Sequence, residues 1–539
     1  MTRLVVLVRR SLVGAALAAV IALLGAAPAS AHAELESTSP ANGARLEQAP
    51  SEIRLRFTES VNLVRDGIRL VDDVGATVPT PDPTADGRTV VWRMPTNLPD
   101  GPYAVTWRVI SSDGHPVGGA FSFGVGAAAG AVPSSAAVST PTSATAPWPV
   151  VAVRLVGYLA FALLAGVVAF VLWCSPGSGS DPSLQRLTRI GLLGGLAAAF
   201  AGLLVQGPYA EGVSMSRLLD ITLLRDTLTT PFGTAMMWRF VLYVGLAVLA
   251  WKLPLVQDRP ARWLVPGGVV ALAVAIAAAG HGAASGRLVD LGVDATHALT
   301  AGIWVGGLVA LVTLGRSVEQ RAVHQFSMLA MTSVLVLVAT GTVNALREVD
   351  ALAQLWETRY GVFLLVKLGL VATALGGAWF SRRRVQEHRV PARSVRFEAG
   401  VLGAVLAVTA VLSMTTPPPK TDPAALAPVN RPANAAVQMT LGDQGSAGLA
   451  VLPANTKGSS LHVLLSGPDG RPLTASRVSL RVSNPRRGLE PATVPLSLRN
   501  GVWTGDFRFL VPGVWKAVLT VQVPGESAVV TGGDVVIFR

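Results

Sequence analysis

The feature that most constrains the fold is a long apolar block in the middle of the chain. From about Pro149 to Met414, hydrophobic segments of helix length follow one another, and the chain as a whole has a mean hydropathy of +0.50 with only 14% charged residues. A soluble multidomain protein does not carry this much apolar sequence, whereas a membrane-spanning helix needs about 20 mainly apolar residues. The sequence therefore predicts an all-α polytopic membrane domain over residues 148–415.

About eight membrane helices are expected in this block. We place them at residues 148–174, 186–207, 233–252, 261–280, 290–314, 325–346, 359–381 and 396–415. Their spacing leaves mostly short loops between neighbours, which is typical of multi-pass membrane proteins.

The orientation follows from the N-terminus. Residues 1–31 have the charged start, the apolar run and the Ala29-Ser30-Ala31 cleavage site of a secretory signal peptide. If the following domain is exported, the first helix runs inward, and the arginine-rich loops, such as the one with Arg382 and Arg383, fall inside. We expect a cell (inner or plasma) membrane protein whose N- and C-terminal domains both lie on the extracytoplasmic side.

Both ends of the chain have the pattern of small β domains. Residues 32–125 contain alternating segments such as Ile53–Phe57, separated by turns rich in Pro, Gly and Asp, which favours a sandwich or a Greek-key barrel. Residues 437–539 repeat the pattern and predict an immunoglobulin-like β-sandwich of unknown role. Two linkers join these domains to the helices: residues 126–147, rich in small residues, and residues 416–436, rich in proline.

Composition excludes several function classes. The formal net charge of +12 comes largely from loops and the leader, so no basic face for nucleic acid is expected. The chain has no G-x-x-x-x-G-K-[ST] motif, so no nucleotide is expected. A single cysteine, Cys174, excludes an intrachain disulfide and multi-thiolate metal sites.

A candidate metal site lies in the first domain. Cleavage after Ala31 makes His32 the first residue, which then offers its α-amine and its imidazole to one metal. Asp113-Gly114-His115 adds a carboxylate and a second imidazole. Three nitrogens and one carboxylate oxygen form the tetragonal set that suits Cu(II). The alternative is that these are exposed residues that bind no metal.

The same domain resembles the CopC family. The resemblance rests on His32-Ala33, on Ser39-Pro40-Ala41-Asn42-Gly43, on Arg54-Leu55-Arg56-Phe57-Thr58-Glu59-Ser60-Val61, and on Ser112-Asp113-Gly114-His115-Pro116-Val117-x-Gly119-x-Phe121-x-Phe123-x-Val125. It implies a cupredoxin-like β barrel with His32, Asp113 and His115 as Cu(II) ligands.

Three further residues of this domain bear on the metal. Some family members carry a methionine-rich segment for Cu(I), but this domain has only Met94, so we expect no Cu(I) site here. Glu34 and Glu59 are either neighbours of the metal ligands or surface groups, and the sequence does not decide between them.

The helical block contains polar residues at its expected outer end. Asp290, Asp294 and His297 follow an i, i+4, i+7 spacing and share one helix face. Ionisable residues inside a membrane are costly and mark candidate functional sites. A possible membrane path for copper, including Cu(I), consists of His281, His297, Met236, Met237 and Asp294. The alternative for each is an ordinary packing or hydrogen-bonding residue.

This block resembles the CopD copper-resistance family over about residues 150–418. The resemblance rests on His297-Ala298-Leu299-Thr300-Ala301-Gly302-Ile303-Trp304-Val305-Gly306-Gly307-Leu308, on His324-Gln325-Phe326-Ser327, and on Tyr360-Gly361 and Lys367-Leu368. Within the first run, Gly302-x-x-x-Gly306 is a small-residue pattern typical of helix contacts. Together the two resemblances identify a CopC–CopD fusion, an arrangement linked to copper uptake across the inner membrane.

The sequence is compatible with three functions. The first is a copper-acquiring membrane protein that captures Cu(II) outside and transports it, with both β domains docked on the outer face of the membrane domain. The second is a tolerance or sensing protein that sequesters copper without transport. The third is a copper-dependent oxidase or monooxygenase, although an aspartate at the metal leaves less room for oxygen chemistry. We expect no enzyme activity, and copper and the lipid bilayer as partners.

Overall fold

The computed structural model describes most of the chain outside its leader and linkers. The described residues are 33, 35–72, 77–126, 147–252, 261–280, 287–386, 392–415, 417–418, 435–452, 454–468, 471–484, 489–499, 501–537. The expected signal peptide, His32, His281 and most of both expected linkers lie outside them. The described residues fall into two compact units: a helical unit built from 147–205 and 225–415, and a β unit that combines both β regions with residues 206–224.

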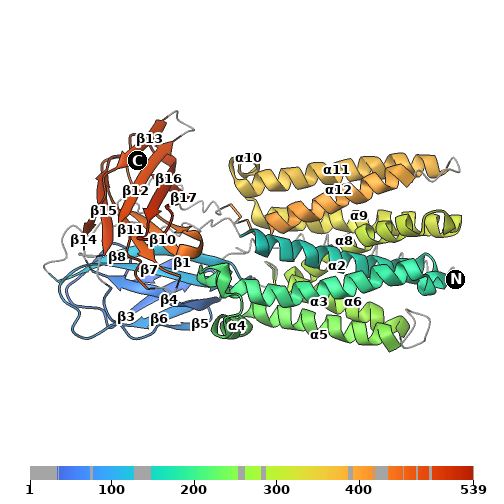
Figure 1. The fold of residues 1–539 in the computed structure, drawn as a ribbon, viewed down its shortest axis with the longest axis horizontal. Coiled ribbons are helices and arrows are strands. Elements are labelled where there is room, and N and C mark those ends of the chain that lie inside the picture. Colours follow the sequence, from blue (N-terminus) through green and yellow to red (C-terminus); the bar gives the residue numbers. More distant parts are fainter. Residues whose placement is uncertain are drawn as a thin grey trace. The chain divides into compact units, whose positions relative to one another are not determined.

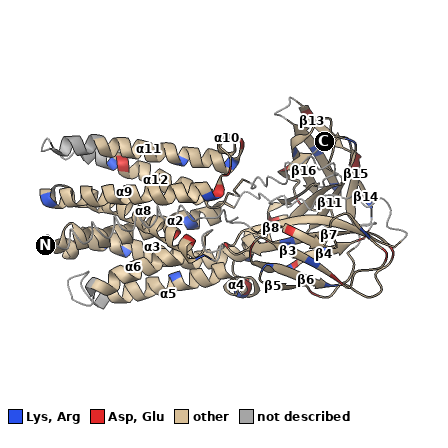
Figure 2. Ribbon diagram, turned by 180° about the vertical axis from the view of Figure 1, so that it is seen from behind, with Lys and Arg blue, Asp and Glu red and all other residues tan. Residues whose placement is uncertain are grey.

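Helices occupy all eight expected places and run side by side as a bundle (Figure 1). They are α2 (Trp148–Trp173), α3 (Pro182–Glu211), α5 (Pro231–Lys252), α6 (Ala261–Ala277), α8 (Leu288–Leu314), α9 (Gln320–Glu348), α11 (Arg359–Gln386) and α12 (Ala392–Leu412). Among the described residues, six helices are long and apolar enough to cross a membrane: α2, α3, α5, α8, α9 and α11. The apolar part of α6, Trp263–Ala277, is shorter. Charged residues are sparse along the bundle (Figure 2), as a lipid environment requires.

Among the described residues, two short α-helices were not expected. They are α4 (Ile221–Leu228) and α10 (Gln354–Glu357), and both lie in segments that the sequence predicts as loops. Some of the long helices also extend beyond their expected limits. For example, α3 begins at Pro182 and ends at Glu211, whereas the sequence predicts residues 186–207.

Helices α2 and α8 pack backbone to backbone through glycines. A Cβ atom built on Gly306 would overlap the carbonyl oxygen of Ala162, and one built on Gly166 would overlap the backbone of Gly306 and Gly307. Small residues allow this close approach. The resulting van der Waals contacts favour helix association in a membrane, where the hydrophobic effect does not drive helices together. The Gly302-x-x-x-Gly306 pattern is therefore a helix contact, as predicted.

The N-terminal β region consists of two four-stranded sheets, with strand orders β1-β3-β6-β5 and β2-β8-β7-β4. Its strands are β1 (Leu35–Ser39), β2 (Ala44–Leu46), β3 (Glu52–Phe57), β4 (Val61–Val71), β5 (Thr84–Asp86), β6 (Thr89–Arg93), β7 (Gly101–Ser111) and β8 (Pro116–Val125). Alternation in β3 buries Leu55 and Phe57, which share one hydrophobic cluster with Val105 and Phe121 of the other sheet. This shared core holds the β7–β8 hairpin, which carries the candidate site.

The C-terminal β region also has two sheets, of orders β14-β15-β11-β10-β9 and β13-β12-β16-β17. Its strands are β9 (Ala435–Thr440), β10 (Ser446–Leu452), β11 (Ser459–Ser466), β12 (Arg477–Asn484), β13 (Leu489–Val494), β14 (Ser497–Arg499), β15 (Val502–Phe507), β16 (Gly513–Gln522) and β17 (Val529–Ile537). One hydrophobic cluster unites the two sheets, with Leu449 and Val463 from one and Leu480 and Leu519 from the other. The prediction of a C-terminal β-sheet region is confirmed.

Candidate metal centre

The candidate metal ligands sit in the tight turn between β7 and β8. The backbone N–H of Ser111 donates to the carbonyl of His115 at 2.9 Å, and the N–H of Gly114 donates to the carbonyl of Ser111 at 2.9 Å. Gly114 has φ = +84°, a left-handed conformation that glycine adopts without steric cost. The turn therefore needs glycine between Asp113 and His115, and it brings their side chains together.

The two side chains meet inside the protein. His115 Nδ1 lies 3.0 Å from Asp113 Oδ2, and the residues are only 6% and 1% exposed. At metal–ligand distances of about 2 Å, two ligands at right angles stand about 2.8 Å apart. The nitrogen and the oxygen thus have the spacing of adjacent corners in a tetragonal metal site, which is also the spacing of an imidazole–carboxylate hydrogen bond.

The second carboxylate oxygen of Asp113 is fixed by the turn itself. Asp113 Oδ1 accepts hydrogen bonds from the Ser111 hydroxyl and, at 3.2 Å, from the backbone N–H of His115. The Ser111 hydroxyl also lies 3.0 Å from the carbonyl oxygen of His115. These contacts orient the carboxylate so that Oδ2 points to the imidazole, which is the role that neighbours of metal ligands usually have.

Glu59 lies in an adjoining turn and is buried, with 3% of its surface exposed. That turn is joined to the candidate site, because the Ser112 hydroxyl donates to the carbonyl of Ser60 at 2.8 Å and Val61 pairs with Ser111. The sequence left open whether Glu59 is a surface group; its burial shows that it is not. Glu34 lies outside the described residues.

The third expected ligand, His32, lies outside the described residues, so the full set stays a prediction. Its neighbour Ala33 is 2% exposed and belongs to the core cluster of this β region. Met94 is buried in the same cluster. In the described part of the chain, no group of three or more His, Cys, Asp or Glu residues has the spacing to hold a metal ion.

In the helical unit, the Asp290–His297 face of α8 lies against α9. His297 Nδ1 is 2.9 Å from the hydroxyl oxygen of Thr340, and Asp290 forms an ion pair of 2.5 Å with Arg347. Both partners are on α9. Asp294, one turn above Asp290, is on the same face by its spacing. The predicted face is therefore a polar contact between two helices.

The methionines of the predicted path differ in their surroundings. Met236 is buried, and its sulfur lies 3.5 Å from a guanidinium nitrogen of Arg239. Arg239 also donates to the carbonyls of Ala275 and Ile276 near the end of α6, at 3.0 and 2.9 Å. Met237 is 39% exposed. The positive charge beside Met236 opposes a bound cation at this sulfur.

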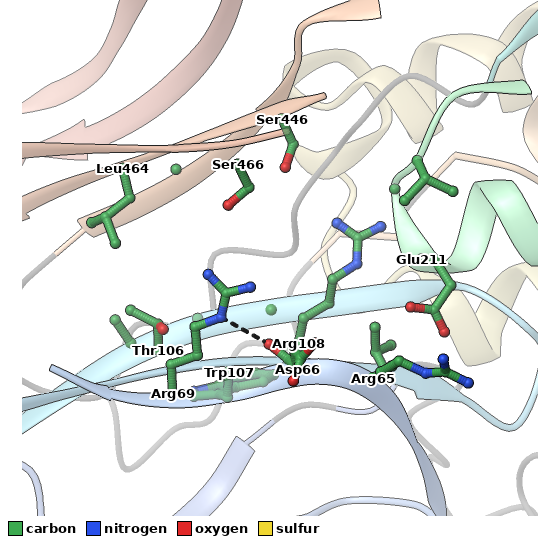
Figure 3. Close-up of a pocket in the computed structure, with 18 of the residues that line it drawn as sticks. Arg65, Asp66, Arg69, Thr106, Trp107, Arg108, Glu211, Ser446, Leu464 and Ser466 are labelled. Atoms are coloured by element: carbon green, nitrogen blue, oxygen red, sulfur yellow. Dashed lines mark hydrogen bonds between the residues drawn. The ribbon is translucent and has the colours of Figure 1, made fainter. Parts of the chain in front are cut away.

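The β unit also has a half-open pocket that the sequence did not indicate (Figure 3). Its volume is about 260 Å³, and its charged lining residues are Arg65, Asp66, Arg69, Arg108, Glu211 and Arg217. Burial lowers the pKa of the Arg108 guanidinium, and the nearby Tyr209 and Glu211 oppose that shift. The described lining contains no His, Cys or Met and has more arginines than carboxylates. Its chemistry disfavours a copper cation, so the β7–β8 turn remains the metal candidate.

Three family models match the chain. The CopC domain matches residues 35–126, the N-terminal domain of the copper resistance protein D-like family matches residues 143–290, and copper resistance protein D matches residues 320–412. The first match contains the β7–β8 turn, and the other two match most of the helical unit but leave out residues 291–319, which form most of α8.

Individual proteins give the same pattern. The chain is 30% identical over 419 residues to the copper transport protein CutJ of Bacillus subtilis (strain 168), a match that covers 73% of this chain and 76% of CutJ. It is 35% identical over 114 residues to copper resistance protein C of Xanthomonas campestris pv. juglandis, covering 20% of this chain and 89% of that protein. Among solved structures, PcoC from Escherichia coli, a methionine-rich copper resistance protein, matches with 34% identity and a TM-score of 0.15, covering 17% of this chain and 98% of PcoC.

The match to CutJ extends over most of both proteins, and the family models add a CopC domain and CopD domains in one polypeptide. The chain therefore belongs to the copper resistance family, as a protein that combines CopC and CopD domains.

Proposed function

We propose that this protein captures Cu(II) on the extracytoplasmic side of the cell membrane and passes copper inward through its helical domain. His32, Asp113 and His115 are the proposed Cu(II) ligands. The observation that carries the proposal is the buried contact of 3.0 Å between His115 Nδ1 and Asp113 Oδ2. This contact presents one nitrogen and one oxygen donor at coordination spacing, and His32 supplies two further nitrogens.

The proposed architecture follows the sequence expectations. The N-terminal β region is proposed as a cupredoxin-like barrel, and the C-terminal β region as an immunoglobulin-like sandwich. All eight long helices are proposed to span the membrane, with both β domains outside. The matched relatives are named as copper transport or resistance proteins, which supports copper handling without an enzymatic step.

In the helical domain, the proposed path begins at His281 and His297 and includes Asp294, Met236 and Met237. His297 is the best-supported member of this path, because its imidazole is hydrogen-bonded to the Thr340 hydroxyl within the bundle. A path through Met236 requires Arg239 to move away from the sulfur. No nucleotide motif is present in the sequence, so transport in this proposal runs on a gradient, an intracellular trap or a partner protein.

The test is cellular copper content. A strain that lacks the protein should accumulate less copper than the parent strain, and the wild-type gene should restore the content. His297→Ala should fail to restore it, although the purified variant still binds Cu(II) through its first domain. Full restoration by His297→Ala would contradict the proposed path.

One observation favours a second function, which is copper sequestration without transport. In the described helical residues, a guanidinium nitrogen of Arg239 lies 3.5 Å from the Met236 sulfur, and its positive charge opposes a copper ion at this point of the proposed path. Under this alternative, deletion makes cells more sensitive to copper and leaves uptake unchanged. The same copper measurements therefore separate the two functions.

A further inference from the structure

The metal-site turn is held by a glutamine from a distant part of the chain. Gln206 donates a hydrogen bond of 2.6 Å from Nε2 to the carbonyl oxygen of Gly114. Gln206 is 3% exposed, so this bond is shielded from water. Gly114 is the residue between Asp113 and His115, and its N–H is already bonded to Ser111. Both backbone polar groups of this central residue are therefore fixed.

The segment that carries Gln206 is itself anchored to strand β7. The guanidinium of Arg108 donates to the carbonyls of Ala210 and Tyr209, at 3.1 and 3.4 Å. These carbonyls belong to the last turn of α3, where helix carbonyls have no partner within the helix and form its negative end. A half-buried cation such as the Arg108 guanidinium is a well-suited partner there.

An apolar contact supports the same anchor. Ala210 forms a small buried cluster with Val64 of β4 and Ile110 of β7. Ala210 and Gln206 are four residues apart and therefore share one helix face. The contacts of Ala210 thus fix the position from which the Gln206 amide reaches Gly114.

We infer that Gln206 is a positioning residue for copper binding: by holding the Gly114 carbonyl, it keeps the donor atoms of Asp113 and His115 at coordination spacing. This inference rests on the proposed copper site. A left-handed glycine in a turn has unusual conformational freedom. Without the Gln206 bond, the Gly114 peptide group can rotate and the two ligands can move apart. Copper binding must then restrict this motion, which adds a cost in conformational entropy.

The test compares two glutamines that make the same kind of bond. Gln206→Met keeps the length of the side chain and removes its donor. Gln522→Met is the matched control, because Gln522 Nε2 also donates to a backbone carbonyl, that of Glu526, at 2.6 Å, but in the C-terminal β region. Both are made in the full chain, purified in detergent with the mature N-terminus. Cu(II) affinity is measured by competition with a chelator, and the ligand field by EPR.

We expect Gln206→Met to raise the Kd for Cu(II) by about 10-fold and to change the copper hyperfine splitting. A loss of about 10-fold is the lower end of the range seen when a group that orients a metal ligand is removed. Gln522→Met should leave both unchanged. If Gln206→Met does not fold, Gln206→Asn, which keeps the amide but shortens its reach by one methylene, should show the same change.

His115→Ala separates failure of this inference from failure of the copper site. If His115→Ala loses the tetragonal signal while both glutamine variants bind as the wild type does, the inference is overturned and the copper site stands. An equal loss in Gln206→Met and Gln522→Met would also overturn it. If His115→Ala binds as tightly as the wild type, the copper site itself is wrong.

Discussion

Asp113 Oδ2 lies 3.0 Å from His115 Nδ1, and the turn around Gly114 removes both side chains almost completely from solvent. A buried carboxylate needs partners, because burying a charge without them is costly. Asp113 has them in Ser111, in the backbone of His115 and in the imidazole. Under the proposed function, Asp113 and His115 would therefore bind Cu(II) with little reorganisation.

A variant of Ser111 tests directly whether the orientation of the Asp113 carboxylate matters for copper binding. Ser111→Ala removes the hydroxyl that bonds to Asp113 Oδ1, so the carboxylate is less firmly oriented. We expect the Kd for Cu(II) to rise about 10-fold, as measured by chelator competition. The matched control is Ser112→Ala, because the Ser112 hydroxyl bonds to Ser60 instead of a proposed ligand. Equal affinities for the two variants would show that Ser111 does not orient the site.

The contact between α2 and α8 makes a prediction about the helical unit. Gly306→Ala places a methyl group against the carbonyl oxygen of Ala162, so the helices must separate. Overpacking of this kind costs about 1–3 kcal/mol, and the midpoint of thermal unfolding in detergent should fall. Gly292→Ala is the control on the same helix, since a Cβ there has no heavy atom within 4 Å. An undiminished midpoint for Gly306→Ala would show that the helices are not in such close contact.

The ion pair between Asp290 and Arg347 joins α8 to α9, and its side chains are 3% and 12% exposed. Asp290→Ala leaves the guanidinium buried without its carboxylate, which typically costs about 3–5 kcal/mol. The variant should unfold in detergent at a clearly lower temperature. Replacing both residues, as in Asp290→Leu with Arg347→Met, should recover much of the loss, because no uncompensated charge remains. If the double variant is no more stable than Asp290→Ala, the two residues do not act as a pair.

His462 on β11 predicts a pH dependence in the C-terminal β region. Burial lowers its pKa below the usual 6.5, and Asp506 only partly opposes this. Below pH 6.5 the unfolded chain therefore binds more protons than the folded one, so stability is present above that pH and falls as the solution becomes more acidic.

Hydrogen exchange can measure this effect locally. Protection of β11, corrected for intrinsic exchange rates, should decrease between pH 7 and pH 5 in the wild type and much less in His462→Gln. The same decrease in both proteins would show that His462 is not the responsible group.

Several parts of this molecule could be predicted because their signals are local. Apolar runs located the helices of the bundle, six of which are long and apolar enough to cross a membrane, and alternation located strands such as β3. Glycine adopts the left-handed conformation without steric cost, so the Gly114 position indicates a turn in which Asp113 and His115 can approach each other.

Other parts depend on contacts between distant residues. Gln206 is 92 positions from Gly114, and no periodicity in either segment indicates their hydrogen bond. The cationic surroundings of Met236 arise from Arg239, one turn along the same helix, but two adjacent carbonyls of α6 set where that guanidinium lies. The burial of Glu59 likewise depends on the fold of its whole β region.

The most direct test of the proposed copper site is a Cu(II) titration of the full chain, read by EPR, with His32 as the free N-terminus and with one extra residue before it. We expect tight tetragonal binding with three nitrogens and one oxygen only for the free terminus, because the extra residue converts the α-amine into an amide. Equal binding by the two forms would contradict it, since the α-amine of His32 would then not be a ligand.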